Sequence, residues 1–305
     1  MTMKSLDDAM MLRNRLIGHL EEADSECSAG IRQPLLTVVV AGGGFAGVET
    51  ILGVNDFLRE ALRHYPNLSA EHLRVVLVTP DDVILAELSP QLGRYAQTKL
   101  AARGVEIIGG RRITRAEGGT VTLDDGRTLP ATTLVWTAGT APNPLVAALP
   151  LAKNRGRLVV DECLAVANAP GMWAVGDCAL VPDGAGGFHP PTAQHALRQG
   201  RRVAENILAD VASRPRKPFR FRTLGQLAAI GRRTGVANVF GVNFSGFVAW
   251  WLWRTIYLAK LQRLEKKVRV ALDWTLDLFF AKDITRYGSA PRRAVSRDEV
   301  RAGAA

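Results

Sequence analysis

Residues Thr37–Glu49 read TVVVAGGGFAGVE, and the rest of the chain is interpreted outward from them. The β-branched run Val38–Val40 predicts a short strand, and the apolar residues after the glycines predict a helix. Between them, Gly42, Gly44 and Gly47 have G-x-G-x-x-G spacing. The first glycine permits a tight turn, the second lets backbone approach a pyrophosphate, and the third lets the helix pack closely on the strand. The stretch therefore predicts a site where dinucleotide phosphates rest on helix N-terminal N–H groups.

The segments after the turn alternate between helical and strand patterns. The expected order is a helix at 46–63, a strand at 74–78, a helix at 88–103 and a strand at 105–108. Strands joined by helical crossovers predict a parallel sheet of the nucleotide-binding type. Residues 111–137 then predict a β-meander with a hairpin turn at Asp125-Gly126, closing in a strand at 133–137.

Local signals outside this unit predict further elements. A helix capped by Ser5 is expected near the start, followed by a loop at 25–34 and a strand from about Leu35. Later in the chain we expect short strands at 157–161 and 172–175, and a helix from Thr192 to about Ala212. The basic segment 213–222 fits either a phosphate-binding patch or a solvated edge strand.

Composition limits the class of protein. The chain has 305 residues and a net charge of +10, which favours anionic surfaces, although a generally basic protein with solvated faces fits as well. Cys27, Cys163 and Cys178 form neither a C-x-x-C pair nor a metal-ligand pattern, so we expect no metal site and no dithiol chemistry. No apolar run reaches the ~18 residues of a transmembrane helix.

The segment from Phe244 to Phe280 changes character, because tryptophans and other aromatic residues alternate with lysines and arginines at helical spacing. This pattern predicts one or two amphipathic helices in a membrane interface, with Trp at the headgroup level and basic residues facing anionic lipid. An ordinary helical pair packed on the body is the other interpretation. No recognised nucleic-acid motif occurs, so no nucleic-acid partner is expected.

Five motifs, in order and spacing, resemble one family, the type II NADH dehydrogenases. The motifs are GGGFAGVE, WTAGTAPNP (136–144), AVGDCA (174–179), AQHALRQG (193–200) and LAAIGRRTGVAN followed by SGFVAWWLWR. The resemblance covers the chain from Leu6 to about Phe280. It implies an FAD-dependent enzyme that passes electrons from NADH to a membrane quinone without proton pumping.

The resemblance assigns roles to individual residues. It implies that Glu49 and Gln194 lie near the reacting rings, where Glu49 relays a proton or stabilises the nicotinamide and Gln194 lies near flavin and quinone. A helix-terminal carboxylate and a surface amide are the structural alternatives. The residues implied in binding NADH or FAD are Gly42, Gly43, Gly44, Phe45, Gly47, Thr79, Gly139, Thr140, Gly176, Asp177 and Ala193.

Thr79 departs from the usual fingerprint. An acidic residue ordinarily ends the second strand and binds the ribose of NAD, whereas Thr79 stands there with Asp81 and Asp82 behind it. Either aspartate reaches back to the ribose or the preference between NADH and NADPH is relaxed. No basic residue stands at this place to bind a 2′-phosphate, so NADH is the expected dinucleotide.

The chain also departs from the family at its start. Family members begin with a flavin-binding half-domain that carries its own Gly-rich turn, whereas this sequence has one such turn, placed as the NADH one. We expect a Rossmann-like NADH-binding domain inserted in a partial FAD-binding domain, followed by amphipathic helices. The expected segments are a linker from the missing half-domain (1–33), the NADH domain (34–145), the returning FAD part (146–225), a membrane-associating region (226–287) and a disordered tail (288–305).

Two functions stay open at this stage. The first is an NADH:quinone oxidoreductase, peripheral on the cytoplasmic face of the cell membrane, with a homodimer left open. The second is a truncated, non-catalytic nucleotide-binding fragment that associates with the membrane and cannot hold FAD. Either another polypeptide supplies the missing half-domain, or the chain is a truncated product or has a misplaced start codon.

Overall fold

The computed structural model describes residues 1–139, 142–280 and 284–286. The chain divides into two compact units. Unit 1 comprises Met1–Thr137, Ile230–Arg233 and the described part of Arg254–Ala305. Unit 2 comprises Ala138–Ala229, without its two undescribed residues, and Thr234–Trp253.

The centre of unit 1 is a four-stranded sheet in the order β3-β2-β1-β7. Its strands are β1 (Thr37–Ala41), β2 (Arg74–Val78), β3 (Val105–Ile108) and β7 (Thr133–Trp136). All three pairings are parallel. Val38, Val39 and Val40 are fully buried, as expected for a strand covered on both faces. The predicted parallel sheet is confirmed, although β7 joins this sheet rather than the meander before it.

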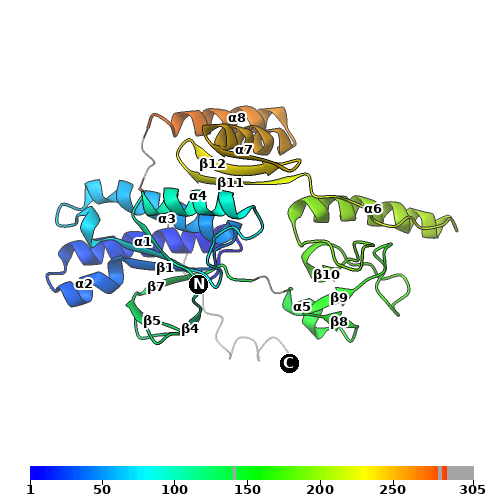
Figure 1. Ribbon diagram of the computed structural model, residues 1–305, viewed down its shortest axis with the longest axis horizontal. Helices are drawn as coiled ribbons and strands as arrows, with labels where there is room; N and C mark the ends of the chain where they lie inside the picture. Colours follow the sequence, from blue (N-terminus) through cyan, green and yellow to red (C-terminus); the bar gives the residue numbers. More distant parts are fainter. Residues whose placement is uncertain (140–141, 281–283, 287–305) are drawn as a thin grey trace, which may run out of the picture. The chain divides into compact units, whose positions relative to one another are not determined.

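Helices connect and cover the strands of unit 1 (Figure 1). They are α1 (Leu6–Ser25), α2 (Ala29–Leu36), α3 (Phe45–Ala61) and α4 (Pro90–Ala101), with short 3-10 turns η1 (Leu62–His64) and η2 (Ala70–His72). The predicted cap of α1 is present: the Asp8 N–H donates to the Ser5 hydroxyl, and the Ser5 N–H donates to the Asp8 carboxylate, both at 3.1 Å. The two reciprocal bonds form a capping box that satisfies free backbone donors at the helix start.

The prediction of a loop at 25–34 was wrong, because α2 occupies most of it and β1 begins at Thr37 instead of Leu35. Pro34 lies inside α2 and removes one helical N–H donor. The helix forms nevertheless because it buries Leu35 and Leu36, and α1 packs against it. Tertiary burial here outweighs the local preference that the sequence expresses.

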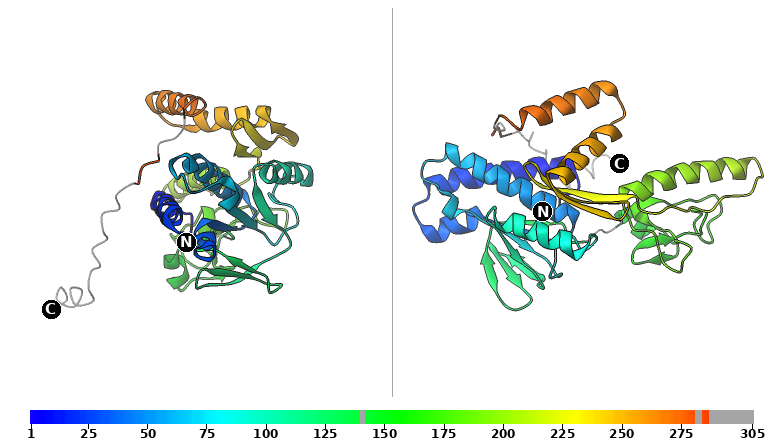
Figure 2. Two further views of the ribbon diagram at one scale, coloured as in Figure 1. Left: turned by 90° about the vertical axis from the view of Figure 1, so that its left-hand side faces the viewer. Right: turned by 45° about the horizontal axis from the view of Figure 1, so that its top comes forward.

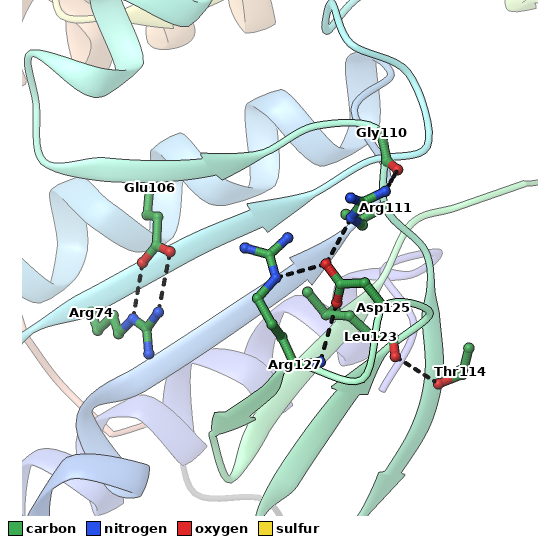
Figure 3. A network of polar contacts seen from close by, with 8 residues as sticks. All are labelled: Arg74, Glu106, Gly110, Arg111, Thr114, Leu123, Asp125 and Arg127. Carbon is green, nitrogen blue, oxygen red and sulfur yellow. Dashed lines mark hydrogen bonds and ion pairs between the residues drawn. The ribbon is translucent and has the colours of Figure 1, made fainter.

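An antiparallel meander of β4 (Ile113–Glu117), β5 (Thr120–Leu123) and β6 (Thr128–Pro130) follows β3. Its core residues pack against valines of β1 and β2. Figure 3 shows the predicted hairpin turn, where the Asp125 carboxylate accepts hydrogen bonds from Arg111 at 2.7 Å and Arg127 at 2.8 Å. Burial alone would raise the pKa of Asp125, but these bonds and the Arg127 backbone N–H lower it overall.

Unit 2 begins with α5 (Pro144–Ala148) and a small sheet of β8 (Lys153–Asn154), β9 (Arg157–Val159) and β10 (Ala179–Leu180). The 3-10 turn η3 (Gly176–Cys178) precedes β10, and α6 (Ala193–Val211) follows within the predicted limits. The strand predicted at 172–175 is wrong, because only an isolated bridge pairs Trp173 with Ala165. The basic segment forms no strand either, and its Phe219 is buried in the core of unit 2.

The last strands are β11 (Gly225–Gly231), β12 (Thr234–Val239) and β13 (Val242–Gly246) in one sheet, with β12 and β13 antiparallel. Figure 2 shows α7 (Phe247–Lys260) and α8 (Leu264–Leu276) as two consecutive helices joined by a short connection. No helix within the described residues is long and apolar enough to cross a membrane. The tail predicted to be disordered, 288–305, lies outside the described residues.

Candidate functional site

The Gly-rich turn between β1 and α3 has the geometry that its spacing predicts. Gly42 has a φ of 112°, which side-chain-bearing residues rarely adopt, and its N–H donates to the Val78 carbonyl at 2.8 Å. Gly44 is the N-cap of α3, and Phe45 begins the helix. A Cβ placed on Gly47 would lie 1.8 Å from the Gly42 carbonyl oxygen. Only glycine therefore fits at Gly47 while the helix start stays this close to the turn.

The buried Thr79 side chain packs against the Gly-rich turn at Gly43. Its side chain is 1% exposed, and a Cβ on Gly43 would lie 2.6 Å from the Thr79 hydroxyl oxygen. Its backbone joins neighbouring segments, because its N–H donates to Ile108 and its carbonyl accepts from Arg111, both at 3.0 Å. Asp81 and Asp82, which follow it, are exposed. The structure thus gives Thr79 a packing role, and its contact with a cofactor stays a prediction.

A carboxylate that sequence reasoning missed lies beside the turn. The Glu87 carboxylate oxygen is 3.3 Å from the position that a Cβ on Gly44 would occupy. The loop carrying it is tied to the turn, because the Leu85 N–H donates to the Gly43 carbonyl at 2.7 Å. Glu87 belongs to no short motif. The one local signal near Glu87 was the Ser89-Pro90 pair, which marks the start of α4 and therefore the end of the loop that carries Glu87.

Glu49 is the fifth residue of α3, just after the first turn of the helix and two residues after Gly47. Glu49 as a whole residue is exposed to solvent, but burial partly desolvates its carboxyl group. This desolvation raises the pKa of the Glu49 carboxyl. Tyr257 of α7 lies within electrostatic reach, and burial together with the negative charge of Glu49 raises the pKa of its phenol. Burial therefore favours the neutral form of the Glu49 carboxyl more than it would at a solvated site, and its role in proton transfer stays a prediction.

The segment that leaves β7 closes the other side of the turn. The Thr137 hydroxyl donates to the Ala41 carbonyl at 2.6 Å and lies 2.8 Å from a Cβ built on Gly47. Sequence reasoning did not select Thr137, although it stands directly before the Ala138-Gly139 turn. Gly139 is exposed and has a φ of 77°. Thr140 lies outside the described residues.

Unit 2 carries the remaining predicted residues. Gly176 begins η3 with a φ of 70°, and its N–H donates to the Gln199 side chain at 2.8 Å. A Cβ on Gly176 would lie 3.3 Å from Ala196 of α6, so this turn packs closely on the helix. Asp177 follows at an exposed position. The second motif therefore presents its carboxylate from a glycine turn braced by α6.

The predicted residues at the start of α6 differ in their surroundings. Ala193 is the exposed first residue of the helix. The Gln194 amide donates to the Gly225 carbonyl at 3.2 Å and accepts from the Leu224 N–H at 3.3 Å. Gln194 therefore fastens the 224–225 segment to α6. His195, regarded as structural from the sequence, is buried, and desolvation lowers its pKa to about 4.

Within unit 1, the fold brings together the Gly-rich turn, Glu49, Thr79, Glu87 and Thr137. Within unit 2, it brings together η3 and the first two turns of α6. No group of three or more His, Cys, Asp or Glu side chains suited to a metal ion occurs in the described part of the chain.

Comparison with known proteins identifies the family. The family model for pyridine nucleotide-disulphide oxidoreductases matches residues 7–200. The chain belongs to the pyridine nucleotide-disulphide oxidoreductases. The NDH2 C-terminal domain model also matches, over residues 224–283. This second match agrees with the resemblance of the motifs to the type II NADH dehydrogenases.

Individual relatives of this pyridine nucleotide-disulphide oxidoreductase are moderately similar. A probable NADH dehydrogenase of Dictyostelium discoideum is 31% identical over 290 residues, covering 93% of this chain and 64% of the relative. The type II NADH:quinone oxidoreductase Ndh of Mycobacterium tuberculosis is 32% identical over 290 residues, covering 90% of this chain and 61% of the relative. The chain thus spans less than two thirds of the length of these relatives.

A solved structure shows the same fold. The NDH2 of Plasmodium falciparum, in complex with NADH, superposes with a TM-score of 0.85 at 16% identity, covering 93% of this chain and 74% of that one. A ferredoxin reductase of Rhodopseudomonas palustris superposes with a TM-score of 0.54 at 24% identity, covering 78% of this chain and 58% of that one. At these identities the likeness concerns the fold alone.

Proposed function

We propose that the chain binds NADH at the turn from Gly42 to Gly47 and works in an FAD-dependent NADH:quinone oxidoreductase. The observation that carries the proposal is the turn itself. Gly47 has no room for a Cβ, and Gly44 is the N-cap of α3, where no side chain caps the N–H groups of the first helical turn. This is the cradle that a dinucleotide pyrophosphate needs. Relatives named as NADH:quinone oxidoreductases support the same reaction class.

The residues of the proposed site divide the work. The backbone of the turn holds the NADH phosphates, and Phe45 and Gly139 border the dinucleotide. Glu49 holds or releases a proton near the nicotinamide, helped by the raised pKa of its carboxyl. Thr79 supports the turn, and a ribose contact from Thr79 or the aspartates after it sets the preference for NADH.

FAD fits the second motif by the chemistry of its groups. Gly176 gives a left-handed turn that exposes the Asp177 carboxylate, an acceptor suited to a ribityl hydroxyl. Ala193 at the helix start and Gln194 beside it would border the flavin and the quinone. When bound, FAD would accept a hydride from NADH and pass the electrons to quinone. The proposed reaction includes no proton pumping, and a homodimer is compatible with it.

We place the enzyme at the cytoplasmic face of the cell membrane, held peripherally by α7 and α8. Support comes from an exposed apolar stripe on α8, where Leu264, Val268, Leu272 and Leu276 recur every fourth residue and are 50–77% exposed. Lys266, Lys267 and Arg269 are interleaved with them on the same helix. Apolar side chains that enter the headgroup boundary, flanked by basic residues, are typical of interfacial helices.

NADH binding tests the first part of the proposal. We expect NADH fluorescence to change saturably with wild-type protein and to stay unchanged with Gly44→Val. A Cβ on Gly44 meets only the end of the Glu87 side chain, so the variant is expected to fold. Equal NADH affinity in the two proteins would remove the role of the turn.

FAD binding is tested separately by the visible absorption spectrum after incubation with FAD and desalting. Retained flavin bands, followed by NADH-dependent quinone reduction, are the expected result. A colourless protein that still binds NADH would favour the non-catalytic nucleotide-binding fragment instead.

Membrane docking is tested by sedimentation with liposomes that contain anionic lipid. Val268→Gln with Leu272→Gln is expected to weaken binding severalfold. A matched control replaces two exposed leucines of α6, Leu197→Gln with Leu208→Gln, and is expected to bind as the wild type does. Equal binding by both variants would refute docking through α8.

A further inference from the structure

A small cavity in unit 2 is lined by an excess of arginine. Its volume is about 260 Å³, and its lining residues come from α6 and from the extended segment after α6. The four lining arginines are Arg198, Arg201, Arg202 and Arg220. Glu205, Phe219 and Phe221 complete the lining. The lining thus combines four cationic side chains with one carboxylate and two aromatic rings.

The arginines converge for structural reasons. Arg201 and Arg202 follow Arg198 by three and four residues, so each is a neighbour of Arg198 on the surface of α6. Arg220 comes from the segment 217–221. Phe219 anchors this segment, because the Phe219 residue is 3% exposed and the Phe219 N–H donates to the Glu162 carbonyl at 2.7 Å. The fold therefore builds the cluster from two segments that it holds in place.

Carboxylates neutralise only half of this charge. Arg202 pairs with Glu205 at 2.6 Å, and Arg220 pairs with Glu162 at 2.9 Å. The Arg198 guanidinium lies 4.2 Å from the centre of the Phe221 ring and donates to the Gln194 carbonyl at 2.8 Å. Among the described residues, neither Arg198 nor Arg201 forms an ion pair. Like charges at this spacing destabilise a helix, so an anion between them would be stabilising.

We propose that this cavity binds the phosphate or diphosphate group of a small soluble molecule. Guanidinium groups present planar pairs of N–H donors that match phosphate oxygens. The cavity is smaller than the ~300–1,000 Å³ of pockets that enclose a drug-sized ligand, so it suits an anionic group and not a whole molecule. Its lining contains none of the residues proposed to bind NADH or FAD. The site thus goes beyond the proposed oxidoreductase function.

Calorimetric titration with inorganic pyrophosphate at constant ionic strength tests the site in the full chain. We expect saturable binding to the wild type, unaffected by saturating FAD. Arg198→Gln with Arg201→Gln is expected to weaken binding by about tenfold or more, since hydrogen bonds to charged groups are strong. The matched control, Arg214→Gln with Arg222→Gln, removes two exposed arginines outside the lining and should change affinity less than about twofold, the weak effect of a screened surface charge.

Several outcomes would overturn the proposal. They are the absence of saturable binding to the wild type, equal weakening by the two double variants, and displacement of pyrophosphate by FAD. Binding of the arginines to phosphatidylglycerol vesicles without binding of pyrophosphate would overturn it too, because the anion would then be a lipid headgroup. Far-UV circular dichroism of both variants identifies a loss of fold, and Arg201→Lys, which keeps the charge, should bind more tightly than Arg201→Gln.

Discussion

Replacing Gly47 with alanine tests how closely α3 must approach β1. The new Cβ would lie 1.8 Å from the Gly42 carbonyl oxygen and 2.8 Å from the Thr137 hydroxyl. The nearest atom belongs to the backbone, so the overpacking cost is near the upper end of its usual range, about 3 kcal/mol. Moving Thr137 also weakens its hydrogen bond to Ala41, at about 1 kcal/mol. Alanine regains about 1 kcal/mol of helix propensity, which leaves a net destabilisation of about 3 kcal/mol.

Gly53→Ala, farther along α3, is the matched control. Apart from its chain neighbours and the nearby backbone of its own helix, no atom lies within 4 Å of a Cβ built at Gly53, an exposed position in α3. Here the helix propensity acts alone and should stabilise the helix by about 0.5–1 kcal/mol. The same chemical change thus has opposite expected effects at two positions of one helix.

Native-state hydrogen exchange measured on peptides from β1 and α3 compares the two variants within unit 1. Gly47→Ala should speed exchange of these amides by about 100-fold, and Gly53→Ala should slow it by about twofold to fivefold. Equal exchange rates in Gly47→Ala and wild type would refute the claim that close packing excludes a Cβ at Gly47.

Three further predictions follow from single side chains. Glu87→Gln should strengthen NADH binding by about threefold to tenfold in a fluorescence titration, because it removes a negative charge beside Gly44; weaker binding would instead make Glu87 a ligand of the ribose. Glu49 has a pKa raised above 4.5, so its stabilising contribution is complete below that pH and is lost as pH rises through the folded pKa. Urea unfolding of Glu49→Gln should therefore lack this pH dependence and show higher stability than wild type at neutral pH. Buried Asn206 makes three hydrogen bonds to backbone groups, so Asn206→Ala should lower the free energy of unfolding by about 3 kcal/mol; a change below about 1 kcal/mol would contradict this.

Local patterns were sufficient wherever the chemistry of a segment depends on near neighbours. The glycine spacing after Val38–Val40 predicted the turn, because only residues without a Cβ satisfy its backbone and packing demands. Ser5 with Asp8 predicted a helix start, and Asp125-Gly126 predicted a hairpin, because the groups that stabilise both features lie within a few residues.

Long-range packing decided what these patterns left open. The helix α2 forms around Pro34 because two leucines are buried, and the expected strand at 172–175 finds no neighbour beyond one bridge. Glu87 reaches Gly44 through a loop whose path depends on backbone contacts with the turn. The arginine cavity likewise joins α6 to the segment that carries buried Phe219, two parts of the chain that no local pattern connects. The sequence by itself determined the Gly-rich turn, whereas only the tertiary structure placed charged side chains around it. The reason is that burial and long-range contacts depend on residues far apart in the chain, so no single segment predicts them.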